Sequence, residues 1–472
     1  MPVELRPYQA AAELPIRQGL SEFRRILVVS PTGSGKGVQI AWMAAGAMAK
    51  QRRVLIVVHR IELVRQTIAA LAAMGITVGI IASGFDERPE ALVQVALVTS
   101  LVRPQRLVRW AGWNPNLLII DEAHHLVAKS WQMLIEIFPQ AFTVGFTATP
   151  LRLDGKGLGR VFGGMVVVAT VKQLIADGWL SPVRYYAPDV GPDLSGARMR
   201  GGDYVAEDVA EAMRRSGLVG DAIAHYQRLC NSGSAIVYAA TIKHSMETAE
   251  QFRAAGVPAQ HIDADTPERD RAEAIAALER GELNILSNVN LFTEGLDLPA
   301  LSGVIMLRST KSLGLYLQMC GRALRAAPGK EFATIIDHAG NVFEHGLCDE
   351  DHLWSLADRE PRKKAAEPAA KRCPECGAIV ALSVRSCPEC GFEFYAGSRE
   401  PATVAGDLEL ADPAEILRVR LRAMPQSRQC AWAGVDYERF RLIGELRGYR
   451  RGWAFHEHQR ALAKQRHKEV RR

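Results

Sequence analysis

The stretch SPTGSGKG at residues 30–37 has the composition of a phosphate-binding loop. It follows the apolar run 26–30 and precedes the helix-like run 38–49, which is the strand–loop–helix context that such a loop requires. Glycines let backbone N–H groups face an anion, and the helix N-terminus adds a favourable dipole. The alternative is a Gly/Ser turn with a chance lysine. We expect a nucleotide site formed by Thr32, Gly33, Ser34, Gly35, Lys36 and Gly37, in which Lys36 reaches the β- and γ-phosphates of ATP.

A second candidate group is the pair of carboxylates at the end of the apolar run 117–122. A strand that ends in two carboxylates can place a metal ligand beside a base. We expect Asp121 to hold Mg²⁺, through water, and Glu122 to orient and deprotonate the attacking water. Two surface carboxylates at a strand end are the alternative, and the upstream loop argues against it.

Gly37 departs from the pattern of such loops, which have Ser or Thr after the lysine as a ligand of Mg²⁺. The missing hydroxyl removes one ligand, but Mg²⁺ keeps several waters and takes few protein ligands. A water can fill that position while Asp121 still anchors the ion. We therefore expect weaker metal binding and slower turnover, with ATPase activity retained.

Arg322 and Arg325 are candidates for the positive charge that a departing γ-phosphate needs. They are three residues apart, so on a helix they share a face. If they come from a second domain, hydrolysis requires the cleft to close, and closure changes the grip on nucleic acid. The alternative is a pair of structural ion pairs.

Four cysteines follow the pattern C-x2-C-x10-C-x2-C, with two CPECG knuckles. Each knuckle turns at its glycine so that two thiolates face one point, and four thiolates make a closed tetrahedral Zn²⁺ site. A redox or disulfide role is the alternative, which an intracellular chain disfavours. The predicted zinc ligands are Cys373, Cys376, Cys387 and Cys390.

The elements that position these residues form two series of short β-branched runs with helix-like stretches between them. Most runs are continuous rather than alternating, as in strands buried on both faces. Strands that alternate with helices give parallel sheets, so we expect two α/β domains joined near residues 180–200. The runs are 26–30, 54–59, 92–99, 117–122 and 142–150 in the first series, and 235–240, 259–264, 283–288, 303–308 and 332–339 in the second.

The chain of 472 residues has room for about three domains. We expect domains at 1–180 and 181–356, a linker at 357–372, a zinc ribbon at 373–395 and a basic C-terminal, helical module at 396–472. No secretory signal and no apolar run of membrane-spanning length is evident, so an intracellular, cytoplasmic protein without membrane contact is expected.

The net charge of +6 is unevenly distributed, because residues 418–472 contain 15 Lys and Arg against 5 Asp and Glu. A basic tail suits a polyanion such as DNA or RNA, and a solvated surface helix is the alternative. The tail interleaves Arg with Tyr449, Trp453 and Phe455, which suits stacking on single strands. The alternative is a helix that packs these aromatics on the core.

Taken together, PTGSGK at 31–36 and DEAH at 121–124 resemble the superfamily 2 helicases of the DEAD/DEAH type. The other motifs occur in order: LRPYQ (5–9), VHRIELVRQ (58–66), VTSL (98–101), TAT (147–149), NVNLFTEGLDLP (288–299) and QMCGRALR (318–325). The resemblance covers residues 1–346. It is nearest to type III restriction motors, transcription-repair helicases and helicases common in phages, which implies a bacterial or phage-infected cell.

The resemblance implies two tandem RecA-like domains and assigns further residues. Arg6 and Gln9, with Tyr8 beside them, would read adenine, and Gly295 and Asp297 would lie near the nucleotide. Arg322 and Arg325 would be arginine fingers. Coupling of hydrolysis to motion would involve His124, Thr147, Thr149 and Gln318. Nucleic-acid contacts would come from His59, Arg60, Thr99, Arg103, Thr241, Lys243 and Thr293.

The function expected from these motifs is ATP-dependent movement on nucleic acid or its unwinding, with ATP, Mg²⁺ and Zn²⁺ as cofactors. DNA is the favoured partner, and the zinc ribbon or basic tail could also bind a protein. Two alternatives remain open. One is a duplex translocase or remodeller that does not separate strands, and the other is a non-hydrolysing ATP-gated clamp, which Gly37 motivates.

Overall fold

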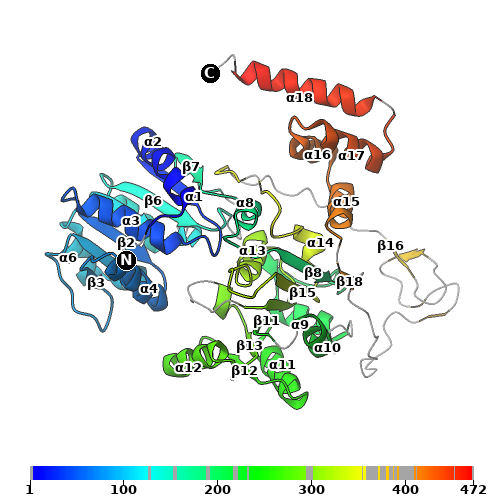
Figure 1. The fold of residues 1–472 in the computed structure, drawn as a ribbon, viewed down its shortest axis with the longest axis horizontal. Helices are drawn as coiled ribbons and strands as arrows, with labels where there is room; N and C mark the ends of the chain where they lie inside the picture. The colour runs from blue at the N-terminus through cyan, green and yellow to red at the C-terminus, as the bar shows by residue number, and fades with distance from the viewer. Residues whose placement is uncertain are drawn as a thin grey trace.

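In the computed structural model, the chain forms two parallel α/β sheets followed by a group of C-terminal helices (Figure 1). This confirms the predicted fold class. The structure describes residues 4–125, 129–151, 157–187, 192–215, 222–230, 233–293, 301–352, 354–357, 370–372, 379–381, 386, 391–392, 409–410, 412–450 and 452–469.

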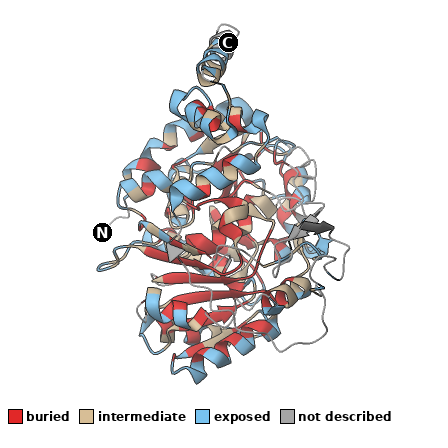
Figure 2. Ribbon diagram, turned by 90° about the vertical axis from the view of Figure 1, so that its right-hand side faces the viewer, coloured by how far each residue is buried: buried red, intermediate tan, exposed pale blue. Residues whose placement is uncertain are grey.

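The first sheet has seven strands, all parallel. Most residues of its central strands are Val, Ile or Leu, and nearly all of them are buried between the helices on the two faces. Figure 2 shows buried strands in the interior of the molecule and exposed positions mainly on the helices and loops. Across the sheet the strands are β3 (Gly79–Ile81), β4 (Val93–Leu97), β2 (Val54–Val58), β5 (Leu117–Ile120), β6 (Phe142–Thr147), β1 (Arg25–Val29) and β7 (Gly164–Val167).

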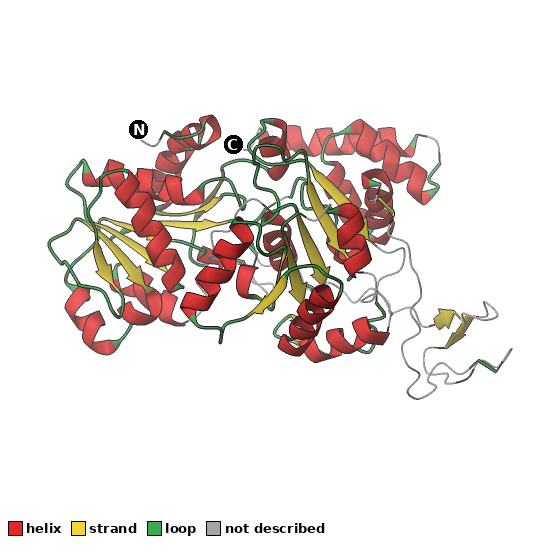
Figure 3. Ribbon diagram, turned by 60° about the horizontal axis from the view of Figure 1, so that its bottom comes forward, coloured by secondary structure: helices red, strands yellow, loops and turns green. Residues whose placement is uncertain are grey.

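The helices of this domain connect successive strands and cover the sheet on both faces (Figure 3). They are α1 (Pro7–Ala11), α2 (Glu13–Phe23), α3 (Lys36–Met48), α4 (Ile61–Ala73), α5 (Val98–Leu101), α6 (Pro104–Ala111), the 3₁₀ turn η1 (Ala123–His125), α7 (Lys129–Ile137) and α8 (Val171–Ala176).

The second sheet repeats this plan with six parallel strands, to which β18 adds an antiparallel edge. The strand β18 pairs with β8 at Ala187 and Tyr186, so the chain returns to this sheet after the Cys-rich segment. In sheet order the strands are β12 (Ala259–Ile262), β13 (Ile285–Asn288), β11 (Ala235–Ala239), β14 (Gly303–Leu307), β15 (Ala333–Asp337), β8 (Val183–Ala187) and β18 (Glu409–Leu410).

Short hairpins and helices complete the second domain. A two-stranded hairpin precedes its first long helix, and a second hairpin lies within the Cys-rich segment. The helices are α9 (Ala206–Arg215), α10 (Ala222–Leu229), α11 (Ile242–Ala254), α12 (Glu268–Glu279), η2 (Leu291–Thr293), α13 (Leu313–Gly321) and α14 (Asn341–His345); the hairpins are β9 (Met199–Arg200) with β10 (Asp203–Tyr204), and β16 (Ala370–Arg372) with β17 (Ile379–Ala381).

The C-terminal helices are α15 (Pro413–Ala423), α16 (Gln426–Ala433), α17 (Tyr437–Arg447) and α18 (Trp453–Glu469). Helix α15 contacts α14 of the second domain, whereas the last three pack on one another around Phe440 and Ile443. Two of the predicted stacking aromatics are used in this packing, since the rings of Tyr449 and Trp453 lie 4.5 Å apart. The packing alternative therefore holds for these two residues, while Phe455 is 51% exposed.

Among the described helices, none combines the length and the apolar character needed to cross a membrane.

Candidate active site at the nucleotide cleft

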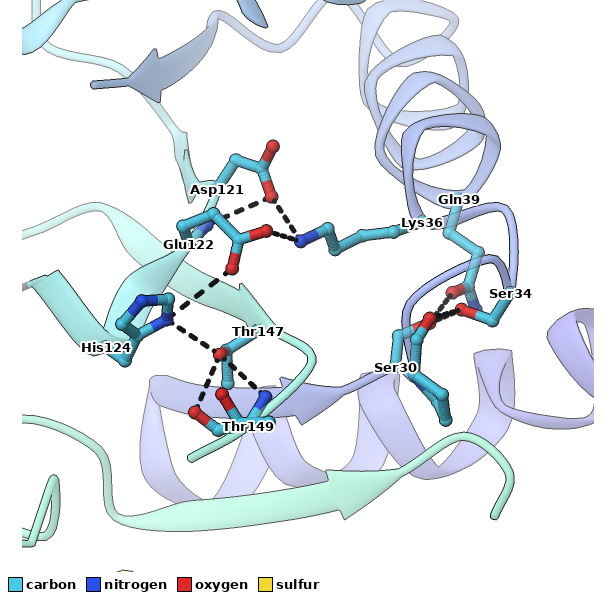
Figure 4. A network of polar contacts seen from close by, with 10 residues as sticks. Ser30, Ser34, Lys36, Gln39, Asp121, Glu122, His124, Thr147 and Thr149 are labelled. Carbon is cyan, nitrogen blue, oxygen red and sulfur yellow. Dashed lines mark hydrogen bonds and ion pairs between the residues drawn. The ribbon is translucent and has the colours of Figure 1, made fainter. Parts of the chain in front are cut away.

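The predicted phosphate loop connects β1 to α3, and its glycines have the expected conformation. Gly33 has φ +83° and Gly35 has φ +75°, in the left-handed region that glycine adopts without strain. Helix α3 begins at Lys36, so its N-terminal N–H groups point into the loop. The Ser30 and Ser34 hydroxyls lie 2.7 Å apart beneath the loop (Figure 4). Because Ser34 also donates to the Pro31 carbonyl at 2.6 Å, we expect it to face phosphate through its backbone N–H.

Lys36 lies between the two carboxylates that follow β5. Its Nζ is 3.1 Å from Asp121 Oδ1 and also forms an ion pair with Glu122 (Figure 4). Burial lowers the pKa of Lys36, but the two carboxylates outweigh this effect and raise it overall. Burial raises the pKa of Asp121, and the Lys36 ammonium opposes that shift. Positive charge is thus already stabilised at these oxygens.

The residues present fit Mg²⁺, because Asp121 and Glu122 offer carboxylate oxygens beside the phosphate loop. Asp121 is only 5% exposed and accepts the Glu122 N–H at 3.0 Å, so its orientation is fixed. A Cβ placed at Gly37 would meet no atom within 4 Å, and the backbone there is not left-handed. The fold therefore leaves room for the hydroxyl side chain that this chain lacks.

A hydrogen-bonded network joins the second carboxylate to the end of β6. His124 Nδ1 lies 3.0 Å from Thr147 Oγ1 and 3.5 Å from Glu122 Oε2 (Figure 4). The Thr147 hydroxyl donates to the Thr149 carbonyl at 3.0 Å and accepts the Thr149 N–H at 3.1 Å. These residues were predicted from motifs to couple hydrolysis to motion, and the structure brings three of them together.

The N-terminal motif packs directly on the phosphate loop. Gln9 Nε2 donates to the Ser34 carbonyl at 2.8 Å, and the Tyr8 hydroxyl donates to the same carbonyl at 2.7 Å. Arg6 lies over the Trp179 ring at 4.5 Å. Trp179 has no motif around it, and only tertiary proximity reveals it beside the predicted adenine readers.

The second domain reaches the phosphate loop through the end of α13. A Cβ at Gly321 would lie 2.6 Å from Thr32 Cβ, so only glycine allows this approach. The predicted helical face shared by Arg322 and Arg325 is wrong, because α13 ends at Gly321. Beyond it the chain forms an isolated antiparallel bridge between Leu180 and Arg325. This bridge places the Arg325 stem beside the loop, where its Cγ would be 3.7 Å from a Cβ at Gly33.

Two further observations concern the arginine-bearing loop. Gln318 is 6% exposed within α13. Lys330, which sequence reasoning missed, donates from Nζ to the carbonyls of Ala323 and, at 2.8 Å, Arg325. Burial lowers the pKa of Lys330 to about 8. The ammonium thus holds the loop that carries both predicted arginine fingers.

The predicted nucleic-acid contacts follow strands of both sheets at their C-terminal ends. His59 and Arg60 follow β2, and Arg60 Nη1 donates across the domains to the Leu291 carbonyl at 3.2 Å. Thr99 lies exposed in α5, and Arg103 precedes α6. In the second domain Thr241 is the N-cap of α11, where its hydroxyl accepts the His244 N–H, and Lys243 has a side chain that is 79% exposed.

The structure does not test several predicted residues. Gly295, Asp297, the four zinc-ligand cysteines and the side chain of Thr293 lie outside the described part of the chain. Among the residues that are described, no group of three or more His, Cys, Asp or Glu side chains could hold a metal ion. The zinc site therefore stays a prediction.

Comparison with known proteins agrees with this site. The family model for the res subunit of type III restriction enzymes matches residues 2–152, and the helicase conserved C-terminal domain matches residues 221–327. A 51.5 kDa protein of Lactococcus phage (isolate 7-9) is 34% identical over 395 residues, which cover 83% of each chain. The chain belongs to the superfamily 2 helicases of the ResIII and Helicase_C type.

Other similar proteins are more distant or longer. The putative ATP-dependent helicase IRC3 of Saccharomyces cerevisiae is 30% identical over 71% of this chain, which spans 51% of the yeast protein. The DNA 3'-5' translocase XPB2 of Sulfurisphaera tokodaii is 24% identical over 68% of this chain and 79% of its own. The C-terminal model UPF0547, an uncharacterised family, matches residues 371–396.

Among solved structures, a fragment of a putative HsdR subunit of a type I restriction enzyme from Vibrio vulnificus YJ016 superposes with a TM-score of 0.57. It shares 22% identity and covers 72% of this chain and 65% of the fragment. At this identity the likeness concerns the fold, and it agrees with the tandem sheets of this helicase.

Proposed function

We propose that this helicase is an ATP-driven nucleic-acid motor that hydrolyses ATP in the cleft between its two α/β domains. The observation that carries the proposal is the packing of Gly321 on Thr32, which brings the arginine-bearing loop of one domain to the phosphate loop of the other. A site completed from two domains makes turnover depend on closure, as a motor requires.

In this proposal Lys36 leaves its ion pairs with Asp121 and Glu122 to contact the β- and γ-phosphates of ATP. Mg²⁺, held through Asp121, would supply positive charge to the phosphate oxygens. Glu122 accepts a proton from the water that attacks the γ-phosphorus, and the bond to the β–γ bridging oxygen breaks to leave ADP and phosphate. Arg322 and Arg325 would stabilise the charge that develops on the transferring group.

The network from Glu122 through His124 and Thr147 to Thr149 supports a coupling role. The contact between α13 and Thr149 supports it further, since a Cβ at Gly314 would lie 3.3 Å from Thr149 Oγ1. A change in the charge at Glu122 would therefore reach the face on which the second domain packs. The shift of one domain against the other would then alter the grip on nucleic acid.

DNA is the proposed track, because the family model is that of a restriction motor and a similar protein is named a DNA translocase. The C-terminal ends of strands in both sheets carry the candidate contacts, which suits a strand held across both domains by its phosphates. Translocation on duplex DNA without strand separation uses the same motifs. Displacement of a labelled strand from a forked duplex separates the two modes.

A non-hydrolysing, ATP-gated clamp is the second candidate function, and Gly37 is the observation that favours it. The absence of the hydroxyl ligand would weaken the metal site, while Asp121 and Glu122 are paired with Lys36 beside the phosphate loop. The clamp would bind ATP and grip nucleic acid without release of phosphate.

The deciding experiment is steady-state ATP hydrolysis against Mg²⁺ concentration with no nucleic acid, single-stranded DNA, duplex DNA and RNA. We expect stimulation by DNA, and a loss of at least about 10²-fold in the Lys36→Ala variant. ATP binding without turnover under every condition would reject the motor and leave the clamp.

A further inference from the structure

The segment that follows α14 connects the two motor domains, and we call residues 347–352 and 354–357 the strap. At its start the strap is anchored in the second domain. Leu347 and Cys348 are buried, and the Cys348 N–H donates to the Tyr185 hydroxyl at 3.0 Å. The Tyr185 hydroxyl in turn donates to Asp349 Oδ1 at 2.6 Å. Strand β8 therefore fixes the start of the strap.

The other end of the strap is bound to the first domain. The Gly159 N–H donates to the Leu356 carbonyl at 2.8 Å, and a Cβ at Gly159 would lie 2.9 Å from that oxygen. Trp354 and Leu356 pack against the apolar cluster of the first sheet that contains Leu158 and Phe162. The first domain thus offers both a backbone donor and an apolar surface to this end.

Between its ends the strap passes the nucleotide cleft. His352 and Trp354 line a small cavity. The cavity is also lined by Thr32 of the phosphate loop, by Thr149, which follows β6, and by Gly321 of α13. The strap therefore crosses from one domain to the other beside the contact that brings the two halves of the site together.

The C-terminal helices hold the middle of the strap. Arg420 of α15 forms an ion pair with Glu350, and the two side chains are 21% and 24% exposed. Gly346, with φ +83°, lies so close to the Arg420 guanidinium that any side chain there would overlap it. The Gly346 carbonyl accepts from the hydroxyl of Tyr316, a fully buried residue of α13, at 2.9 Å.

We propose that Arg420 is a positioning residue for nucleotide binding. Through Glu350 it fixes the strap, and the strap holds the two domains in the arrangement that places α13 on the phosphate loop. Through this contact the C-terminal helices influence how tightly the motor binds ATP. The inference rests on the proposed function, since it assumes that ATP binds between the domains. Loss of the ion pair lowers the closed population and so weakens apparent ATP binding by the same factor.

The test is the Arg420→Ala variant of the full chain, with Arg418→Ala as the matched control, because Arg418 is exposed on the same helix. We expect Arg420→Ala to raise both the equilibrium dissociation constant of a fluorescent ATP analogue and the KM for ATP by about tenfold. At saturating ATP and DNA, kcat should stay within about twofold of the wild-type value, since ligand binding then drives closure. The Glu350→Arg, Arg420→Glu double variant should restore the KM.

Equal nucleotide affinity in Arg420→Ala, Arg418→Ala and the wild type would overturn the proposal. Circular dichroism shows whether Arg420→Ala disrupts the C-terminal helices. If it does, the proposal is tested instead with Leu356→Ala, at the end of the strap that binds the first domain. An unchanged nucleotide affinity in Leu356→Ala would then reject the proposal. If the wild type binds ATP without hydrolysing it, only the proposed motor function is rejected. The equilibrium dissociation constant of the ATP analogue still tests the role of the strap. A wild-type chain that binds no ATP overturns both.

Discussion

The hydroxyl of Thr147 and the Nδ1 atom of His124 lie 3.0 Å apart, and this contact joins the end of β6 to the turn after β5. Both residues are buried or nearly so, and the threonine also bonds both backbone groups of Thr149. The contact therefore forms part of a polar route from Glu122 to the surface on which α13 packs.

Thr147→Val removes this hydroxyl and keeps the shape of the side chain. We expect DNA-stimulated ATP turnover to stay within about threefold of the wild type, because Lys36 and Glu122 are untouched, while strand displacement or translocation falls about tenfold. The two rates are measured on the same preparation. Thr143→Val is the control, since Thr143 is buried in the same strand and its hydroxyl donates to the Ala141 carbonyl at 3.4 Å, away from the network around Glu122. Equal losses in both rates would contradict a coupling role.

Gly37→Thr restores the hydroxyl that the metal site lacks. Because a Cβ at Gly37 meets no atom within 4 Å, the side chain fits without disturbing α3. We expect the Mg²⁺ concentration at half-maximal ATP hydrolysis to fall about tenfold. Gly46→Ser is the control, since Gly46 lies in the same helix with equally open surroundings. If both variants show the wild-type Mg²⁺ titration, the metal-ligand argument for residue 37 is rejected.

The sequence predicted ten strands correctly, because most of them are apolar runs inside a parallel sheet; β12 is the exception, an edge strand with the sequence AQHI. Among the strands of the two large sheets it missed β3, β7 and β18, which are short or partly exposed edge strands without such a run. It also missed β8, which lies between β15 and β18 but has the sequence VRYYA, with an arginine and two tyrosines in place of an aliphatic run. The face predicted for Arg322 and Arg325 was wrong because α13 ends at Gly321, where the phosphate loop packs against it. The phosphate loop belongs to the other domain, so no local sequence pattern around Gly321 predicts this contact. Trp179 was missed because its contacts with Arg6 and Tyr8 join distant parts of the chain. Lys330 was missed although its carbonyl partners are near in sequence, because no motif surrounds it.

Lys243→Ala tests the nucleic-acid surface. Its side chain is 79% exposed and forms a long ion pair with Glu247, at 3.8 Å. If Lys243 contacts a phosphate, the variant should weaken DNA binding similarly for all sequences and reduce the slope of log affinity against log salt by about 1. Fluorescence anisotropy across a salt series measures both. Lys50→Ala should leave the slope unchanged, because Lys50 lies between α3 and β2, at the N-terminal ends of the strands and not at the C-terminal ends that carry the candidate contacts. An unchanged slope in both variants would exclude Lys243 from the interface.

The Cys-rich segment should bind one zinc ion per chain, because four thiolates complete a tetrahedral site. Metal analysis of the purified protein is expected to find zinc at that stoichiometry, and Cys376→Ser should lose it. Cys430→Ser is the control, since this cysteine lies in α16, outside the pattern. ATP turnover should survive the loss of zinc, since the nucleotide site lies in the two sheets. A zinc-free wild-type chain in which all four predicted ligand cysteines are reduced would reject the zinc ribbon.

The Lys330 ammonium holds the Ala323 and Arg325 carbonyls, and burial lowers its pKa from 10.5 to about 8. As pH rises through 8, the folded protein loses this charge and the grip on the arginine-bearing loop weakens. We therefore expect kcat to fall about tenfold between about pH 7 and pH 9.5. Lys330→Arg stays charged and should shift this fall to higher pH, whereas Lys172→Ala, at an exposed lysine, should keep the wild-type profile.

Stability distinguishes this effect from simple unfolding. Between about pH 8 and 10.5 the unfolded chain binds more protons at Lys330 than the folded chain does, so this residue's contribution to stability increases with pH. The loss of activity should therefore precede any loss of structure in a thermal melt followed over the same pH range. Coincident pH profiles of kcat for the wild type and Lys330→Arg would show that another group controls the alkaline limb, because the arginine cannot lose its proton there.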